Sequence, residues 1–217
     1  MEIFDYKKSL VENIYLISGP ILAILGFAAI LQLRLTKKAM IMSSKRQAAE
    51  LATKQINVYC KQIIPLQDKF TDKKREQNIE RIVPENLKKF TIQELESNVN
   101  HEIIKKKTKE FVDNIDDILA ILNAFESFAI YFTKGVADEE IAFSSIGRTY
   151  CFSVETFSFD LSIIRKDDEI CGFENVIKLY QMWNAKLKSD KISRELTKKQ
   201  IELDKLKINK VDILGTK

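Results

Sequence analysis

The stretch that decides the fold is Ile14–Leu33, IYLISGPILAILGFAAILQL, in which no residue carries a formal charge. At about 1.5 Å of rise per residue, a helix of this length spans roughly the 30 Å hydrocarbon core of a bilayer. We therefore predict a transmembrane helix over residues 14–33, with residues 1–13 as a short outer tip.

Two other interpretations of this stretch are a cleaved signal peptide and a core helix of a soluble domain. A signal peptide has an apolar core of about 7–15 residues and then a cleavage site of small residues. Here the apolar run is longer and leads directly into Arg34. A soluble core helix usually keeps a polar stripe for water, and this run has none. The pattern therefore favours a membrane anchor.

Three small residues share one face of the predicted membrane helix. Gly19, Ala23 and Gly26 follow one another at spacings of four and three, so a second helix can approach them closely. The pattern indicates helix packing within the membrane, although small residues are also common in membrane helices that pack against nothing.

Basic residues follow the apolar run directly. They are Arg34, Lys37, Lys38, Lys45 and Arg46, and no acidic residue precedes Glu50. Because Lys and Arg mark the cytoplasmic flank of a membrane helix, we expect the N-terminus outside and the body in the cytoplasm, at the inner (plasma) membrane. The same cations suit anionic lipid head groups, at about 1 kcal/mol each.

The composition restricts the chemistry of the body. The net charge of +4 over 217 residues does not favour a nucleic-acid partner. Cys60, Cys151 and Cys171 are odd in number and widely spaced, so they form neither a disulfide framework nor a zinc knuckle, and free thiols suit a reducing cytoplasm. The single histidine, His101, lies in a polar run, where we expect an exposed position on a helix.

Three acidic residues suggest a metal site, but the other ligands that such a site needs are missing. Glu110, Asp113 and Asp117 lie within two helical turns of one another. Carboxylate-bridged metal sites in helical proteins combine such residues with a Glu-x-x-His pair, and no histidine is available nearby. We expect no metal and no cofactor.

After the membrane helix, an apolar stripe indicates that the helix continues as a stalk over residues 34–70. The stripe recurs at spacings of four and three and consists of Ala52, Ile56, Tyr59, Ile63, Leu66 and Phe70. Such a stripe is either a seam between chains or the face that the helix lays on its own domain, and the short length favours the second. Pro65 should bend or soon end the helix, with a polar connector over Thr71–Asn78.

The remainder is predicted as a small helical bundle over residues 71–188. Pro84 and Thr91, the latter with Glu94 three residues on, indicate helix starts. Ile118–Phe132 should be the central buried helix, Gly135 its C-cap, and Asp138 the start of the next helix. The fold class is therefore all-α.

The C-terminal part of the chain contains one segment of ambiguous secondary structure and two helical segments. Tyr150–Ile164 fits both a strand and a helix, and we choose the helix because no second strand is available to pair with it. Phe173–Leu187 repeats aromatic residues at helical intervals. Residues 189–217 form a Lys-rich amphipathic tail.

Asn123 and Glu126 lie inside the most apolar helix of the body. A carboxylate in that position must find a partner or shift its pKa. One interpretation is a contact with a ligand or partner protein. The other is a buried hydrogen-bonded pair, with Arg148 or Arg165 as candidate partners, that fixes how the helices pack, and this is the one we favour.

The chain resembles a broad bacterial family of uncharacterised single-pass membrane proteins. The resemblance is carried by Leu122-Asn123-Ala124-Phe125-Glu126, Ala129, Gly135, Asp138-Glu139-Glu140, Phe173-Glu174 and Trp183. It implies a membrane helix followed by a small helical cytoplasmic domain of unknown function, over residues 14–187. It implies no known reaction and no catalytic residues.

These observations lead to two functional expectations from different classes. The first is a non-enzymatic interaction module, anchored to the bilayer, that binds a protein partner or self-associates. The alternative is a membrane-disrupting effector of an antiphage (abortive infection) system. A hydrolase built around His101 is a third and much weaker option, since a triad would depend on that one imidazole.

Overall fold

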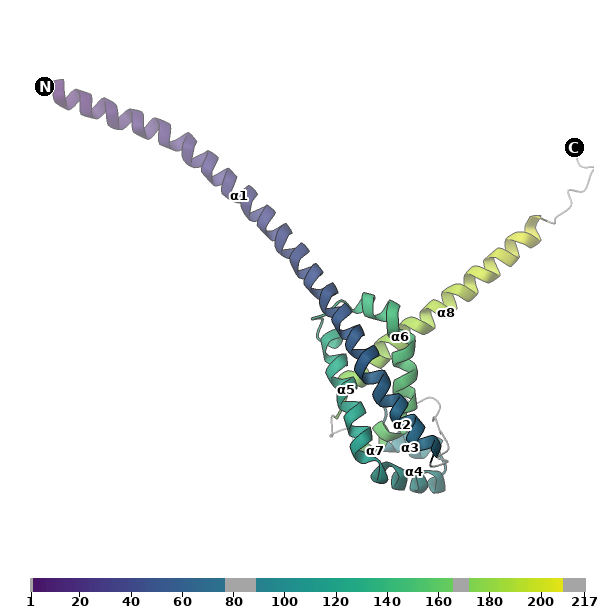
Figure 1. Ribbon diagram of the computed structural model, residues 1–217. Helices are drawn as coiled ribbons and strands as arrows, with labels where there is room; N and C mark the ends of the chain where they lie inside the picture. The colour runs from purple at the N-terminus through teal and green to yellow at the C-terminus, as the bar shows by residue number, and fades with distance from the viewer. Residues whose placement is uncertain (1, 77–88, 166–171, 209–217) are drawn as a thin grey trace, which may run out of the picture. The chain divides into compact units, whose positions relative to one another are not determined.

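The computed structural model describes residues 2–76, 89–165 and 172–208 (Figure 1). Every regular element in these ranges is helical, so the all-α prediction is confirmed. The chain divides into two compact units, Met1–Ala48 and Ala49–Lys217. The predicted start of the helix at Pro84 lies outside the described residues.

The first unit consists of most of helix α1 (Glu2–Val58), so the predicted outer tip is helical from Glu2 onward. Among the described residues, one helical stretch is long and apolar enough to cross a membrane, and none of its most apolar window is buried. Leu22 is 66% exposed and Phe27 is 64% exposed. A helix that served as the core of this protein would bury such side chains, so the core-helix interpretation fits poorly.

Helix α1 leads through a π-helical turn, η1 (Tyr59–Ile63), into α2 (Ile64–Glu76). The wide turn is visible in the hydrogen bond from the Ile64 N–H to the Tyr59 carbonyl, five residues back. Pro65 follows directly, within a helix that continues to Glu76, and the widened turn is where the helix accommodates the missing N–H of the proline. Of the two predicted effects of Pro65, a bend or an early end, the early end is wrong: the helix continues to Glu76, so residues 71–76 of the predicted connector are helical.

Most of the predicted stripe is buried. Ala52, Tyr59, Ile63 and Phe70 are buried in the second unit, as expected for a helix that packs on its own domain. Leu66, by contrast, is 39% exposed. Beyond the turn, the helix therefore departs from the predicted stripe at Leu66 and returns to it at Phe70.

The core of the second unit is aromatic. Ring centroids lie 5.2 Å apart for Tyr59 and Phe128, 5.6 Å for Phe128 and Tyr150, and 5.0 Å for Tyr150 and Trp183. These four rings come from η1, α5 (Ile115–Thr133), α6 (Glu139–Thr156) and α8 (Glu174–Ile208). Helices α5 and α6 both pack along α8 (Figure 1). The core therefore holds together segments that are far apart in the sequence.

Capping residues set the ends of the short helices. Thr91 caps α3 (Ile92–Asn98) by accepting from the Glu94 N–H, as predicted, and the Glu94 carboxylate accepts from the Phe90 N–H. Asn100 caps a separate helix, α4 (His101–Asp113), by accepting from the Glu102 N–H.

The predicted central helix and the turn after it are present. Helix α5 buries Ile118, Leu122, Phe125 and other apolar residues on one face. Gly135 adopts φ +67°, the left-handed conformation of a helix C-cap. Asp138 then caps α6 by accepting from the N–H groups of Glu140 and Ile141. The predicted roles of Gly135 and Asp138 are confirmed.

The ambiguous segment 150–164 is helical, as chosen, but it is interrupted. Helix α6 ends at Thr156, and α7 (Ser158–Ile164) begins after Phe157. The last helix, α8, runs without a break from Glu174 to Ile208. The predicted division at residue 188 is therefore not a break in secondary structure.

Candidate functional site

Glu126 is bound to the N-terminus of α8. Its carboxylate accepts hydrogen bonds from the Val176 N–H at 3.0 Å, the Asn175 N–H at 3.3 Å and Asn175 Nδ2 at 2.6 Å. Asn175 Oδ1 in turn accepts from Thr133 Oγ1 at 2.6 Å. A carboxylate at this position satisfies N–H groups of the first turn and complements the positive end of the helix dipole. Glu126 therefore fastens α8 to α5.

The rest of the predicted pair has to be corrected. Asn123 is exposed, because it lies on the face of α5 opposite the buried side chains, and only Glu126 is half-buried. Arg148 and Arg165, the predicted partners, lie elsewhere: Arg165 donates to the Gly172 carbonyl at 2.6 Å, and Arg148 lines a surface hollow. Sequence reasoning missed Asn175, although an Asn beside the first residue of a predicted helix is a familiar signal of a helix start.

A second carboxylate, Glu139, ties α6 to α8. It accepts from Trp183 Nε1 and from Lys186 Nζ, and it is only partly exposed. Trp183 itself is fully buried. Glu126 and Glu139 thus act on α8 from two helices, and both serve the packing of the body.

Hydroxyl groups in the core form a small hydrogen-bonded chain. Tyr59 donates to Ser153 Oγ at 3.1 Å, and Ser153 donates to Gln67 Oε1 at 2.9 Å. Burial raises the pKa of Tyr59 to about 12. The phenol therefore stays a hydrogen-bond donor at neutral pH, and the chain of hydrogen bonds links η1, α2 and α6.

A cluster of charged side chains lies where α2, α4 and α7 supply ionisable groups. Asp160 is 6% exposed and Lys107 is 8% exposed. Lys107 donates to Glu110 at 2.7 Å. Burial raises the pKa of Asp160 to about 6, against the attraction of Lys74 and Lys107, which lowers it. Burial likewise lowers the pKa of Lys74. The cluster makes the stability of the body dependent on pH.

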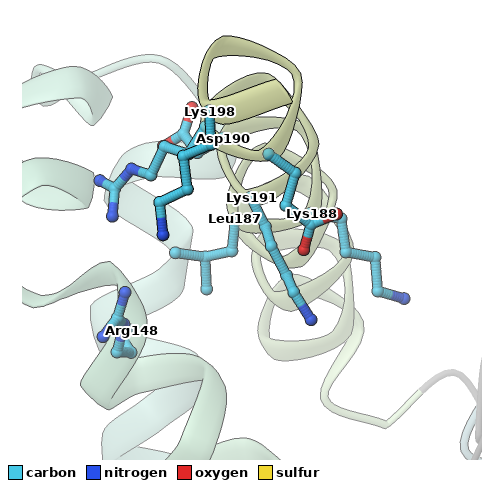
Figure 2. Close-up of a pocket in the computed structure, with 8 residues that line it drawn as sticks. Arg148, Leu187, Lys188, Asp190, Lys191 and Lys198 are labelled. Atoms are coloured by element: carbon cyan, nitrogen blue, oxygen red, sulfur yellow. The ribbon is translucent and has the colours of Figure 1, made fainter. Parts of the chain in front are cut away.

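A hollow of about 480 Å³ lies between α6 and α8 (Figure 2). Its cations are Arg148, Lys188, Lys191, Arg194 and Lys198, against the two acids Asp190 and Glu195. Figure 2 shows Arg148 on its own helix, across the hollow from the lysines of α8. All seven charged side chains are exposed to solvent. The excess of positive charge attracts anions to this face of the body.

The predicted acidic group holds no metal arrangement. Among the described residues, no three His, Cys, Asp or Glu side chains are placed to hold a metal ion. Asp117 accepts from Lys73 at 2.6 Å, and Glu110 pairs with Lys107. His101 is exposed at the start of α4, where it was expected.

The predicted membrane residues belong to the first unit. Arg34, Lys37, Lys38, Lys45 and Arg46 are all exposed on α1. Gly19, Ala23 and Gly26 are exposed on the same helix, and a Cβ added at Gly19 or Gly26 would meet nothing within 4 Å. Both sets are therefore accessible to a lipid or to another helix.

Comparison with known proteins gives a match to one family, described as "Domain of unknown function (DUF4760)", over residues 20–183. The match covers most of the chain. The chain belongs to this family. No curated protein and no solved structure matches it.

The DUF4760 match confirms the predicted resemblance to an uncharacterised family. Its limits also bear on the site. It begins within α1 at residue 20 and ends at Trp183, so it contains Glu126, Glu139 and the start of α8. The part of α8 beyond Trp183, including most of the lining of the hollow, lies outside the matched range.

Proposed function

We propose that this DUF4760 protein is a membrane-anchored, cytoplasmic interaction module with no chemistry of its own. The observation that carries the proposal is the exposed apolar surface of α1, where no residue of the most apolar window is buried. Apolar surface of this extent is costly in water, and a bilayer is the environment that removes the cost.

The orientation rests on the five exposed cations after Leu33. A cytoplasmic second unit is supported by the positive charge on that flank of the apolar run, which comes from Arg34, Lys37, Lys38, Lys45 and Arg46. At the inner leaflet they also interact with anionic lipid head groups. The lipid bilayer is thus the first partner.

The absence of chemistry is supported by what the polar groups of the body do. Glu126 and Glu139 hold α8, and Tyr59 is kept protonated within a structural chain. Each of these groups has a packing role that accounts for its position. The function is therefore binding, either to a protein partner or to further copies of the chain.

Cysteine accessibility tests the topology, because the native cysteines all follow the membrane segment. Cys60 is exposed, whereas Cys151 is buried and burial raises its pKa to about 12. A membrane-impermeant maleimide should leave the protein unlabelled in intact cells and label Cys60 after permeabilisation. A Ser9→Cys variant should be labelled in intact cells. Labelling of Cys60 in sealed cells would invert the protein and refute the proposed orientation.

The alternative function is a membrane-disrupting effector of an antiphage system. It is favoured by the exposed small-residue face of α1 at Gly19, Ala23 and Gly26, which permits close packing of membrane helices. Induced expression with a potential-sensitive dye separates the two functions. A module that only binds leaves the membrane potential unchanged, whereas a triggered effector abolishes it.

A further inference from the structure

The C-terminal half of α8 is a long helix whose described side chains all face solvent. From Lys188 to Lys205 every residue is exposed. Ile192 is 57% exposed, Leu196 is 63% exposed and Leu203 is 52% exposed. An isolated helix of this length is marginal in water, and burial of an apolar face is what normally stabilises one.

The three apolar residues fall on one stripe. Ile192, Leu196, Lys199, Leu203 and Leu206 follow one another at spacings of four, three, four and three. This is the a/d spacing of a heptad repeat, with Leu196 and Leu203 at a positions and Lys199 at a d position. We call Ile192, Leu196 and Leu203 the α8 stripe. At about 100° per residue, Ile201 lies roughly 140–180° away from its three members.

We propose that the α8 stripe is the seam of a parallel coiled coil with a second copy of this chain. The inference deepens the proposed function, since it names the surface and the partner, and its choice of a parallel pair rests on the membrane anchor. Copies anchored in one bilayer with one topology are related by an axis along the membrane normal, and a coiled coil whose own axis lies along that normal is parallel.

The charges beside the stripe favour this partner over others. One flank carries Glu195 and Glu202 at g positions, and the other carries Ser193 and Gln200 at e positions. In a parallel pair each g position faces the e position five residues further along the partner, so Glu195 faces Gln200 and Glu202 faces Lys207. An antiparallel pair brings g positions together and would set Glu195 of one copy beside Glu202 of the other. The two glutamates also disfavour an anionic lipid surface as the partner. A helix that lies on such a surface carries cations beside its apolar face.

Lys199 has a defined role in such a seam. A single lysine at a core position lowers stability but specifies register and the number of strands. On its own helix it lies four residues after Glu195 and three before Glu202, spacings at which opposite charges are neighbours. The lysine is thus compensated locally, and a shift of one heptad would place it against Ile192 or Leu206 of the partner copy.

The seam is short, and the anchor makes up for its length. Residues 189–206 span only about 27 Å at 1.5 Å per residue, which is fewer heptads than most free coiled coils have. Two copies held in one membrane meet at a much higher effective concentration than in solution. The pairing therefore depends on both the stripe and the anchor.

Disulfide crosslinking of the full-length protein in native membrane vesicles tests the seam. The background carries Cys60→Ser and Cys171→Ser, and Leu196→Cys, Leu203→Cys and Ile201→Cys are each added to it. Facing a positions of a parallel pair lie close together, and a disulfide needs Cα atoms within about 7 Å. Leu196→Cys and Leu203→Cys should each give several-fold more crosslinked dimer than Ile201→Cys, a matched control since Ile201 is 51% exposed.

Mixed and charged variants complete the test. Coexpressed Leu196→Cys and Leu203→Cys chains should not crosslink to each other above the Ile201→Cys level, and a strong mixed product would overturn the parallel arrangement. Leu196→Glu, but not Ile201→Glu, should abolish the Leu203→Cys crosslink with no change in melting temperature. Equal crosslinking at all three positions, with the protein in the membrane fraction, refutes the seam alone. Recovery in the soluble fraction instead refutes the anchor.

Discussion

Replacing Glu126 by Ala tests whether one carboxylate holds α8 in place. The carboxylate accepts two backbone N–H groups and one side-chain N–H at the N-terminus of α8. Hydrogen bonds to a charged group contribute about 1.5–3 kcal/mol, and loss of a helix cap costs about 0.5–2 kcal/mol. Because Glu126 is half-buried, water replaces part of the loss. We expect Glu126→Ala to lower the free energy of unfolding by about 2–4 kcal/mol, and Glu126→Gln, which keeps an acceptor, by less.

The assay is thermal unfolding of the detergent-solubilised chain, followed by circular dichroism. At about 2–4 °C per kcal/mol for a domain of this size, Glu126→Ala should lower the melting temperature by about 4–16 °C. Asn123→Ala is the matched control, because Asn123 lies three residues away on the same helix and is exposed. Its effect should stay within about 0.5 kcal/mol.

Hydrogen exchange provides a second, local readout of the same substitution. The Val176 N–H should exchange faster in Glu126→Ala than in the wild type, since its acceptor is lost. If Glu126→Ala has the same melting temperature as Asn123→Ala and leaves the exchange rate of the Val176 N–H unchanged, the carboxylate does not hold α8 and the assignment is refuted.

Two further predictions concern pH and backbone conformation. Because the pKa of Asp160 is raised from 3.8 to about 6 in the folded state, its contribution to stability falls as pH rises between about 4 and 6. Asp160→Asn should therefore raise the melting temperature above that of wild type more at pH 7.5 than at pH 4. The corresponding difference in unfolding free energy between the two pH values is up to about 3 kcal/mol. An equal effect at both pH values would contradict this. Gly135→Ala should cost about 1–2 kcal/mol, since Gly135 has φ +67° and open space around it, while Gly135→Asn should cost less because Asn tolerates that conformation. Equal melting temperatures for these two variants would argue against the strain.

The sequence by itself determined the features that depend on local chemistry. The uncharged run after Asn13 was sufficient to identify an apolar helix, since length and composition alone decide whether a helix matches a bilayer. Thr91, Gly135 and Asp138 were recognised as caps because a cap acts on backbone groups only a few residues away. The burial of Tyr59 and Phe128 followed from apolar spacing.

Tertiary structure decided which distant residues meet. Nothing local relates Glu126 to Asn175, because the contact depends on how α5 and α8 pack, and so the sequence offered arginines as partners instead. The spacing around Asn123 did not separate its exposed face from the buried one. The π-turn before Pro65 is likewise an effect of backbone hydrogen bonding that side-chain periodicity does not carry. Sequence patterns report on residues that are close along the chain, whereas these contacts form only when the helices pack into the core.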